Sequence, residues 1–215
     1  MRWFQLTLLG LALAGPARGE DIVDVLRRSQ QMRLDAMPLA ADGPRADAVR
    51  RSFAQLREAL PADVAVELRV IAGGTLAETL HGRIIVANES LADLPEAARL
   101  FVLAHELGHV ASDHWQQMGA VYRHWVPGEV SPQTTDPVAN QLGREASVTS
   151  HRQEFEADAY ASRVLRAMGR PPQDSFAVFM STVLQQDTAT HPGTRKRIAS
   201  LRAAQAGVAS GHDAE

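Results

Sequence analysis

Alternating hydrophobic and polar positions predict a short β-sheet in the first half of the chain. Every second residue between positions 63 and 70 is hydrophobic, which is the two-residue period of a half-buried strand: Val64, Val66, Leu68 and Val70. Gly73-Gly74 ends this run, and a second apolar run covers residues 83–87 after the turn candidate His81-Gly82. Two short strands that lead into a helix give an α+β fold class.

Helical periods cover most of the remaining chain. Residues 20–63 predict two helices joined by a turn-rich stretch at 38–44, and we expect them to pack on the main body as a lid or brace. A central helix follows, with Asp93 as its expected N-cap, Pro95 in its first turn and Glu96 as the capping-box partner. Its apolar residues between 100 and 110 cover nearly the whole circumference, which is typical of a buried helix.

Turn signals and helical periods alternate in the second half of the chain. Residues 119–149 are rich in turn residues, and we expect a long excursion that forms a wall or lid of a site. Helices are predicted at residues 152–168, 174–186 and 194–205, so the fold is mainly helical. The predicted organisation is an N-terminal helical segment at 20–63, a main domain at 64–207 and a disordered tail at 208–215.

The first 19 residues have the features of a signal peptide. Arg2 supplies a minimal positive charge, residues 3–14 form an apolar run, and small residues follow, so that cleavage fits after Ala14 or after Gly19. The alternative is an uncleaved N-terminal segment that tethers the protein to a membrane. We favour export, and therefore expect a soluble protein in the bacterial periplasm or outside the cell.

Composition excludes several classes of protein. The 215 residues suffice for one domain with a sizeable core. The net charge is -3 and no stretch gathers arginine into a basic patch, which argues against a nucleic-acid partner. The chain has no cysteine, so neither a disulfide framework nor a lipid-bearing cysteine is available. Beyond residue 19, no apolar run is long enough for a stable membrane span.

The central helix carries the motif His105-Glu106-Leu107-Gly108-His109. Two histidines four residues apart lie one turn above the other on one helix face, so both imidazoles can bind the same metal ion. Glu106 is rotated away from that face by about a quarter-turn and can reach a metal-bound water. The alternative is a pair of buried histidines that bind backbone carbonyls. Because the helix is capped and apolar all round, we favour the metal site.

A catalytic zinc site needs a third protein ligand, and a carboxylate is the best candidate. A third histidine in the extended motif would fall at position 115, where this chain has Trp115, while His114 either borders the site or binds a backbone group. Glu154 shares a helical stripe with apolar residues, whereas Glu156 points almost oppositely, so we favour Glu154. Asp158, one turn beyond Glu154, can hold the other ring N–H of a ligand histidine, or it is a surface acid.

Together these residues resemble the zinc metallopeptidases of family M48, over roughly residues 64–202. The resemblance rests on the HELGH motif with His114, on the Glu154-x-x-x-Asp158 spacing, and on His191-Pro192-x-Thr194-x-x-Arg197. It implies a zincin-like metalloprotease core, in which a short sheet or hairpin packs on the motif helix. It also implies one Zn²⁺ per chain, held by His105, His109 and Glu154. This chain lacks the transmembrane helices of some members and the C-terminal repeat domain of others.

The expected mechanism is hydrolysis of a peptide bond. Glu106 is predicted to take the proton of a zinc-bound water and to pass it to the leaving amine. By resemblance, His191 lies near the cleft and stabilises the oxyanion; otherwise it is a loop histidine before a helix. Arg197 either pairs with a carboxylate near the site or is solvated. Also by resemblance, Arg83–Ala87 is expected to be the edge strand of the cleft, to which an extended peptide adds; its side chains also suit a core.

Two functions remain from the sequence. The first is a zinc metalloendopeptidase that cuts unfolded, misfolded or unassembled envelope proteins, as a form of quality control. The second is a zinc-binding chaperone or assembly factor that keeps the fold with little proteolysis. The intact Glu106 favours the first, because a purely structural zinc site has no need of a base at that position.

Overall fold

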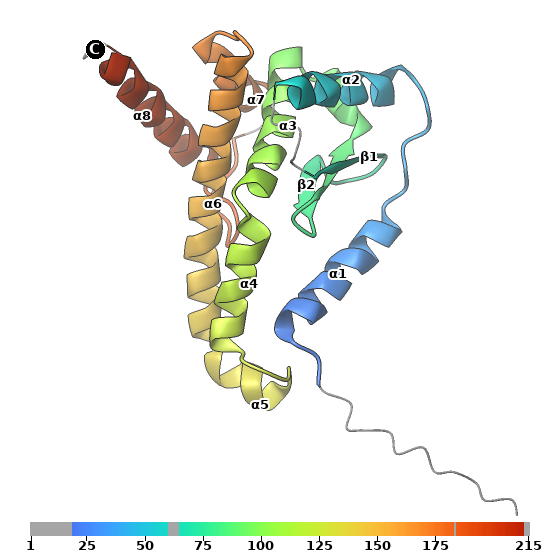
Figure 1. Ribbon diagram of the computed structural model, residues 1–215, viewed down its shortest axis with the longest axis vertical. Helices are drawn as coiled ribbons and strands as arrows, with labels where there is room; N and C mark the ends of the chain where they lie inside the picture. The colour runs from blue at the N-terminus through green and yellow to red at the C-terminus, as the bar shows by residue number, and fades with distance from the viewer. Residues whose placement is uncertain (1–18, 60–64, 183, 213–215) are drawn as a thin grey trace, which may run out of the picture.

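The protein is described by a computed structural model that covers residues 19–59, 65–182 and 184–212. Most of the described residues lie in helices, and a three-stranded sheet packs among them (Figure 1). In chain order, the elements are α1 (Ile22–Ala36), α2 (Pro44–Glu58), β1 (Glu67–Ile71), β2 (Ala77–Leu80), β3 (Ile84–Asn88), η1 (Glu89–Asp93), α3 (Glu96–Ala111), α4 (His114–Trp125), α5 (Pro132–Thr135), η2 (Asp136–Val138), α6 (Ala139–Ala167), η3 (Pro172–Phe176), α7 (Ala177–Ser181) and α8 (Thr194–His212). The mainly helical α+β class predicted from the sequence is confirmed.

The sheet has the strand order β1-β3-β2, with β3 parallel to β1 and antiparallel to β2. All five residues of β3 are buried, because α-helices cover both faces of this central strand. The prediction that residues 83–87 form the edge strand of the cleft is therefore wrong. β2 is an edge strand, and the sequence analysis missed it because Ala77-Glu78-Thr79-Leu80 is short and carries little hydrophobic signal.

The sheet lies between α1 and α3. On one face, Leu34 of α1 packs with Leu80, Ile84 and Val86. On the other face, Ile85 and Ala87 join the main core, to which α3 contributes its apolar side chains. The N-terminal helix α1 thus acts as a brace behind the sheet, which is one of the two roles expected of residues 20–63.

The longest helix, α6, lies beside both α3 and α4, which follow each other along its length (Figure 1). α3 and α6 lie close together at Gly108, where an added Cβ would lie 3.0 Å from the Cα of Ala157. Any larger residue at position 108 would push the two helices apart. Gly108 precedes His109, and Ala157 precedes Asp158, so this contact aligns the functional side chains of both helices.

The predicted excursion at residues 119–149 is wrong over most of its length. α4 continues to Trp125 and α6 already begins at Ala139, so only the residues between these two helices lie outside a long helix. A local core explains the difference: Ile22 and Val23 of the brace pack with Val126, Tyr122 and Leu142. Trp125 Nε1 also donates a hydrogen bond of 2.6 Å to Glu145 Oε2. These tertiary contacts outweigh the local turn signals.

Other helix boundaries also differ from the prediction. Asp93 ends the short helix η1 and pairs with Arg45, and α3 begins after Pro95, so the expected capping box is wrong. The helix predicted at 174–186 is shorter, because the backbone becomes extended at Thr182. α8 extends to His212, past the predicted end at 205 and into the segment expected to be a disordered tail.

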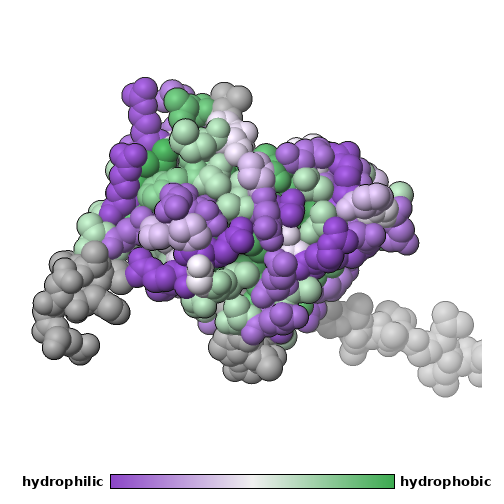
Figure 2. Space-filling view, turned by 90° about the horizontal axis from the view of Figure 1, so that it is seen from above, coloured by the Kyte–Doolittle hydropathy of each residue, from purple (hydrophilic) through white to green (hydrophobic). Residues whose placement is uncertain are grey.

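The predicted signal peptide, apart from Gly19, lies outside the described residues. Within the described part of the chain, none of the helices combines the length and the apolar character that crossing a membrane requires. In the space-filling view, hydrophilic side chains cover much of the visible face and hydrophobic residues gather in one part of it (Figure 2). The larger apolar side chains mostly lie inside, around α3.

Candidate metal centre and active site

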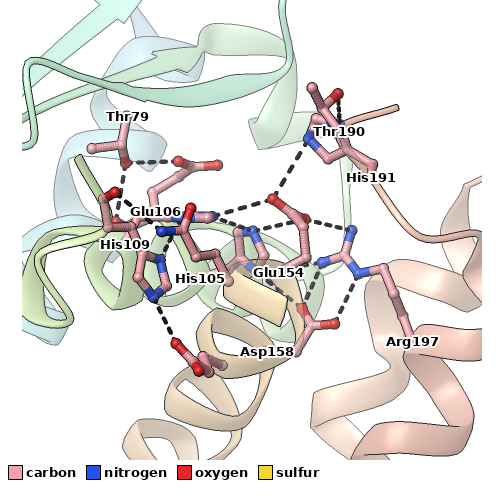
Figure 3. Close-up of polar contacts among 12 residues, drawn as sticks. Thr79, His105, Glu106, His109, Glu154, Asp158, Thr190, His191 and Arg197 are labelled. Atoms are coloured by element: carbon pink, nitrogen blue, oxygen red, sulfur yellow. Dashed lines mark hydrogen bonds and ion pairs between the residues drawn. The ribbon is translucent and has the colours of Figure 1, made fainter. Parts of the chain in front are cut away.

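The structure brings His105, His109 and Glu154 together between α3 and α6, with one ligand atom of each within 4.8 Å of the others (Figure 3). The two Nε2 atoms of the histidines lie 3.1 Å apart. Glu154 Oε2 lies 3.5 Å from His105 Nε2, and Glu154 Oε1 lies 3.4 Å from His109 Nε2. Three donors from two helices therefore converge on one point, as the helical stripe predicted.

Zinc fits this arrangement of donors. Two imidazole nitrogens and a carboxylate are the protein ligands of many catalytic zinc sites, which leave one position open for water. Glu154 Oε2 is buried and has no hydrogen-bond partner among the described residues, although Arg197 Nη1 lies 3.6 Å away. A buried carboxylate oxygen without a donor is unfavourable, and a bound cation would satisfy it.

The electrostatics of the group also favour a cation. Burial by itself would raise the pKa of Glu154, but His105 and His109 lower that pKa far more, so the carboxylate is ionised. For His105, burial lowers the pKa, while Glu154 and Asp158 raise it, and the net result is a pKa above the ordinary value. The pocket thus stabilises positive charge beside Glu154, which is also the condition for holding Zn²⁺.

The ring of His105 is oriented by the ion pair between Asp158 and Arg197. Its Nδ1 lies 2.9 Å from Asp158 Oδ1, which fixes the Nε2 lone pair toward the metal position. Asp158 in turn accepts hydrogen bonds of 2.8 Å and 2.5 Å from Nε and Nη2 of Arg197 on α8. Burial raises the pKa of Asp158, but Arg197 and His105 lower it below its usual range. Of the two alternatives for Arg197, the structure shows pairing with a carboxylate.

His109 is held by a different group. Its Nδ1 lies 2.8 Å from Nδ1 of His114, and His114 Nε2 lies 3.1 Å from Glu156 Oε2. If His109 keeps Nε2 free for a metal, its Nδ1–H must donate to His114 Nδ1, and His114 must then donate Nε2–H to Glu156. One tautomer of each ring satisfies all these contacts. His114 thus borders the site, and Glu156 also forms a 3.1 Å ion pair with Arg152.

Glu106 faces the cleft from α3 and is fixed by Thr79 of β2 (Figure 3). Thr79 Oγ1 lies 2.8 Å from Glu106 Oε2 and 3.0 Å from the backbone oxygen of Glu106. A hydroxyl that donates to one carboxylate oxygen leaves the other available for a water. The sequence analysis missed Thr79, because the strand that carries it was not predicted.

His191 reaches the same cleft from the loop before α8. Its Nε2 lies 3.6 Å from Glu154 Oε1, and its side chain is 54% exposed. Asp187 shapes this loop, since its Oδ1 accepts a 2.6 Å hydrogen bond from the backbone N–H of Gly193. Thr188 N also donates a 2.9 Å bond to His191 O. The structure thus places His191 beside the predicted ligands, while its role in stabilising an oxyanion stays a prediction.

The cleft extends to both sides of His105, His109 and Glu154. One cavity of about 230 Å³ and another of about 150 Å³ share the residues at the centre: Ala77, His105, Glu106, Glu154 and His191. β2 borders both cavities, so the edge strand of the sheet runs along the cleft. A zinc position, a carboxylate base and an elongated cleft define the class of zinc metallopeptidases.

The chain belongs to peptidase family M48, whose family model matches residues 75–205. This match confirms the resemblance seen in the sequence, and members of the family are zinc metallopeptidases. A search among curated proteins found no match. Among solved structures, the chain is similar to Ste24p of S. mikatae, with 17% sequence identity and a TM-score of 0.45. That similarity covers 83% of this chain and 55% of Ste24p, so the chain spans about half the length of that protein.

Proposed function

We propose that this protein is an endopeptidase that cuts unfolded or misfolded protein chains. The observation that carries the proposal is the position of Glu106. Its carboxylate lines the cleft beside the three converging ligands, and Thr79 holds it there at 2.8 Å. A structural zinc site needs no free carboxylate next to an open cleft, whereas peptide hydrolysis needs a base at that position.

His105, His109 and Glu154 would hold the zinc ion, which supplies Lewis acidity and lowers the pKa of a coordinated water. Glu106 accepts the proton of the attacking water and then delivers it to the nitrogen of the leaving amine. His191 Nε2 faces the cleft near Glu154 and donates to the oxygen that becomes negative during the attack. Thr79 keeps the Glu106 carboxylate oriented throughout these proton transfers.

The edge strand β2 favours extended substrates. One edge of β2 pairs with β3, and residues Ala77, Glu78 and Thr79 line the larger cavity. An extended peptide can add to such an edge through backbone hydrogen bonds, which do not depend on its sequence. A folded protein rarely exposes a strand in this form. Misfolded or unassembled proteins of the cell envelope are therefore the proposed substrates, in a periplasmic or secreted location that rests on the predicted signal peptide.

The test is the substitution Glu106→Gln in zinc-loaded protein, with cleavage of denatured casein followed by mass spectrometry. We expect zinc content to stay at the wild-type level and cleavage to fall by at least about a hundredfold, because the base is lost. Glu129→Gln, outside the cleft, is the matched control and should cleave as wild type does. Equal cleavage by Glu106→Gln and wild type would contradict the assignment of Glu106. If wild type cuts nothing but suppresses aggregation of casein, the chaperone alternative holds instead.

A further inference from the structure

A buried glutamine borders the cleft on the side of α6. Gln153 directly precedes the predicted ligand Glu154 on that helix and lines the cavity of about 230 Å³, although the residue is only 5% exposed. α6 and β2 lie on opposite sides of α3 (Figure 1), so Gln153 and the edge strand belong to different walls of the cleft. A primary amide buried in this way is favourable only when both of its ends find hydrogen-bond partners.

The nitrogen end of this amide already has its partners. Gln153 Nε2 donates a hydrogen bond of 3.1 Å to the backbone oxygen of His114, which can only accept. It also lies 3.5 Å from Gln117 Oε1. The orientation of Gln117 is fixed in turn, because its Nε2 donates a 2.7 Å bond to the backbone oxygen of Ser112 and its Oε1 accepts a 3.3 Å bond from Arg152. The oxygen of Gln153 must therefore point away from these partners on α4.

The oxygen end of the amide has no partner in the part of the chain that the structure describes. No described group donates to Gln153 Oε1, and this atom is not among the fully enclosed polar atoms. Since the rest of Gln153 is buried, its accessible oxygen opens on the cavity that it lines. When a substrate fills the cleft and displaces water, this acceptor needs an N–H or O–H donor from the substrate.

An extended substrate can supply this donor from its backbone. In a strand that pairs with β2, the N–H and C=O groups of alternate residues point toward β2, and those of the residues between them point away. The N–H groups that point away find no acceptor on β2 and need one on another wall of the cleft. Gln153 Oε1 is an acceptor of this kind, and it belongs to the residue next to Glu154.

We infer that Gln153 positions the substrate: its Oε1 accepts a hydrogen bond from a backbone N–H that points away from β2. This inference rests on the proposed peptidase function and on the addition of the substrate to β2. A substrate held from two walls cannot turn about its own axis, so the carbonyl to be attacked stays oriented toward Glu106 and the predicted ligands. The bond uses only backbone groups, so it is the same for every substrate sequence, as the cleavage of unfolded chains requires.

The first test compares Gln153→Met with wild type on a peptide substrate. Methionine has a similar shape but no amide oxygen, so a substrate N–H is left in the cleft without its acceptor. We expect kcat/KM to fall by about tenfold, with zinc content at the wild-type level. Gln205→Met is the matched control and should cleave as wild type does, because the amide of Gln205 bonds to Ser162 and Pro172 away from the cleft. If Gln153→Met loses its fold, Gln153→Leu takes its place. An unchanged kcat/KM would overturn the inference.

A second set of peptides tells positioning apart from a structural role. In each peptide, one backbone N–H outside the cut bond is replaced by an ester oxygen. In wild type, the replacement that removes the donor to Gln153 should lower kcat/KM by about tenfold. In Gln153→Met, the same replacement should change kcat/KM by less than about twofold, because the bond is already lost. If every ester had the same effect in both proteins, Gln153 would not bind the substrate backbone.

A binding measurement separates this inference from the proposed function. Calorimetry compares the same peptides on zinc-loaded Glu106→Gln protein, with and without the substitution Gln153→Met. If wild type cuts no peptide, but one ester weakens binding only while Gln153 is present, the role of Gln153 is supported and the proteolytic function is contradicted. If wild type cuts the peptides and no ester effect depends on Gln153, the inference about Gln153 alone fails.

Discussion

The two predicted histidine ligands are oriented by different kinds of groups. His105 is backed by Asp158 and Arg197, an ion pair that joins α6 to α8, with Asp158 completely buried. His109 is backed by the neutral ring of His114, whose outer partner, Glu156, has a side chain that is 40% exposed. Both supports fix a tautomer, but only the first one places full charges in the protein interior.

Because of this difference, we expect the two supports to affect different properties of the protein. The Asp158–Arg197 pair connects distant parts of the chain, and a buried charge without its partner is strongly unfavourable. The His114–Glu156 pair links α4 to the neighbouring surface of α6, where water can replace a lost partner. We therefore expect the first support to determine whether the protein folds, and the second to adjust how tightly it binds zinc.

The largest effect is expected for Asp158→Ala, which removes both hydrogen bonds that Asp158 accepts from Arg197 and leaves this largely buried cation only the 3.6 Å contact with Glu154. The free energy of unfolding should fall by about 3–5 kcal/mol, measured by urea denaturation of the metal-free protein. Glu156→Ala, on the same helix, is the control and should change the free energy by less than about 1 kcal/mol because its side chain is partly solvated. If the two variants lost the same free energy of unfolding, the claim that only the support of His105 determines folding would be refuted.

His114→Ala is expected to have a smaller effect, on zinc affinity. Loss of the group that orients His109 should weaken zinc binding by about 10–100-fold, measured by competition with a chromogenic chelator. His114→Gln should recover part of the affinity, because its amide can accept from His109 and donate to Glu156. If His114 had a purely structural role, His114→Ala would lower the melting temperature of the metal-free protein and leave the relative zinc affinity unchanged. We predict instead that the melting temperature stays the same and the zinc affinity falls.

The support of His191 should have the smallest effect, because Asp187 and Lys196 are solvent-exposed. The bonds from Lys196 and from the Gly193 N–H lower the pKa of Asp187. The stabilisation is therefore present at pH values above the ordinary pKa of aspartate, and is lost as the pH falls through the lower pKa of the folded protein. Wild type should melt at a higher temperature than Asp187→Asn at pH 7, and the difference should vanish on acidification. A difference that grows toward low pH would contradict this account.

Much of the candidate site could be predicted because helical spacing places residues on a face without knowledge of the fold. His105 and His109 are four residues apart, as are Glu154 and Asp158, and each lies near the position that this spacing implies. The roles of these residues in catalysis and metal binding stay predictions.

The remaining parts depend on tertiary contacts that leave no local signal. Thr79 lies on a strand of four residues that exists because β3 pairs with it. The partner of His109 could not be found from the sequence, since the ring of His114 reaches it only through the tight turn at Asp113, whose φ is +52°. The edge strand was misassigned because the assignment of residues 83–87 followed the family resemblance. A fully apolar strand is typical of the centre of a sheet.

The central claim is that His105, His109 and Glu154 together hold one zinc ion. Zinc content by mass spectrometry, after dialysis against a weak chelator, tests it most directly in wild type, Glu154→Gln and Glu156→Gln. The account predicts one zinc per chain in wild type and in Glu156→Gln, and almost none in Glu154→Gln. Full zinc occupancy in Glu154→Gln would contradict it.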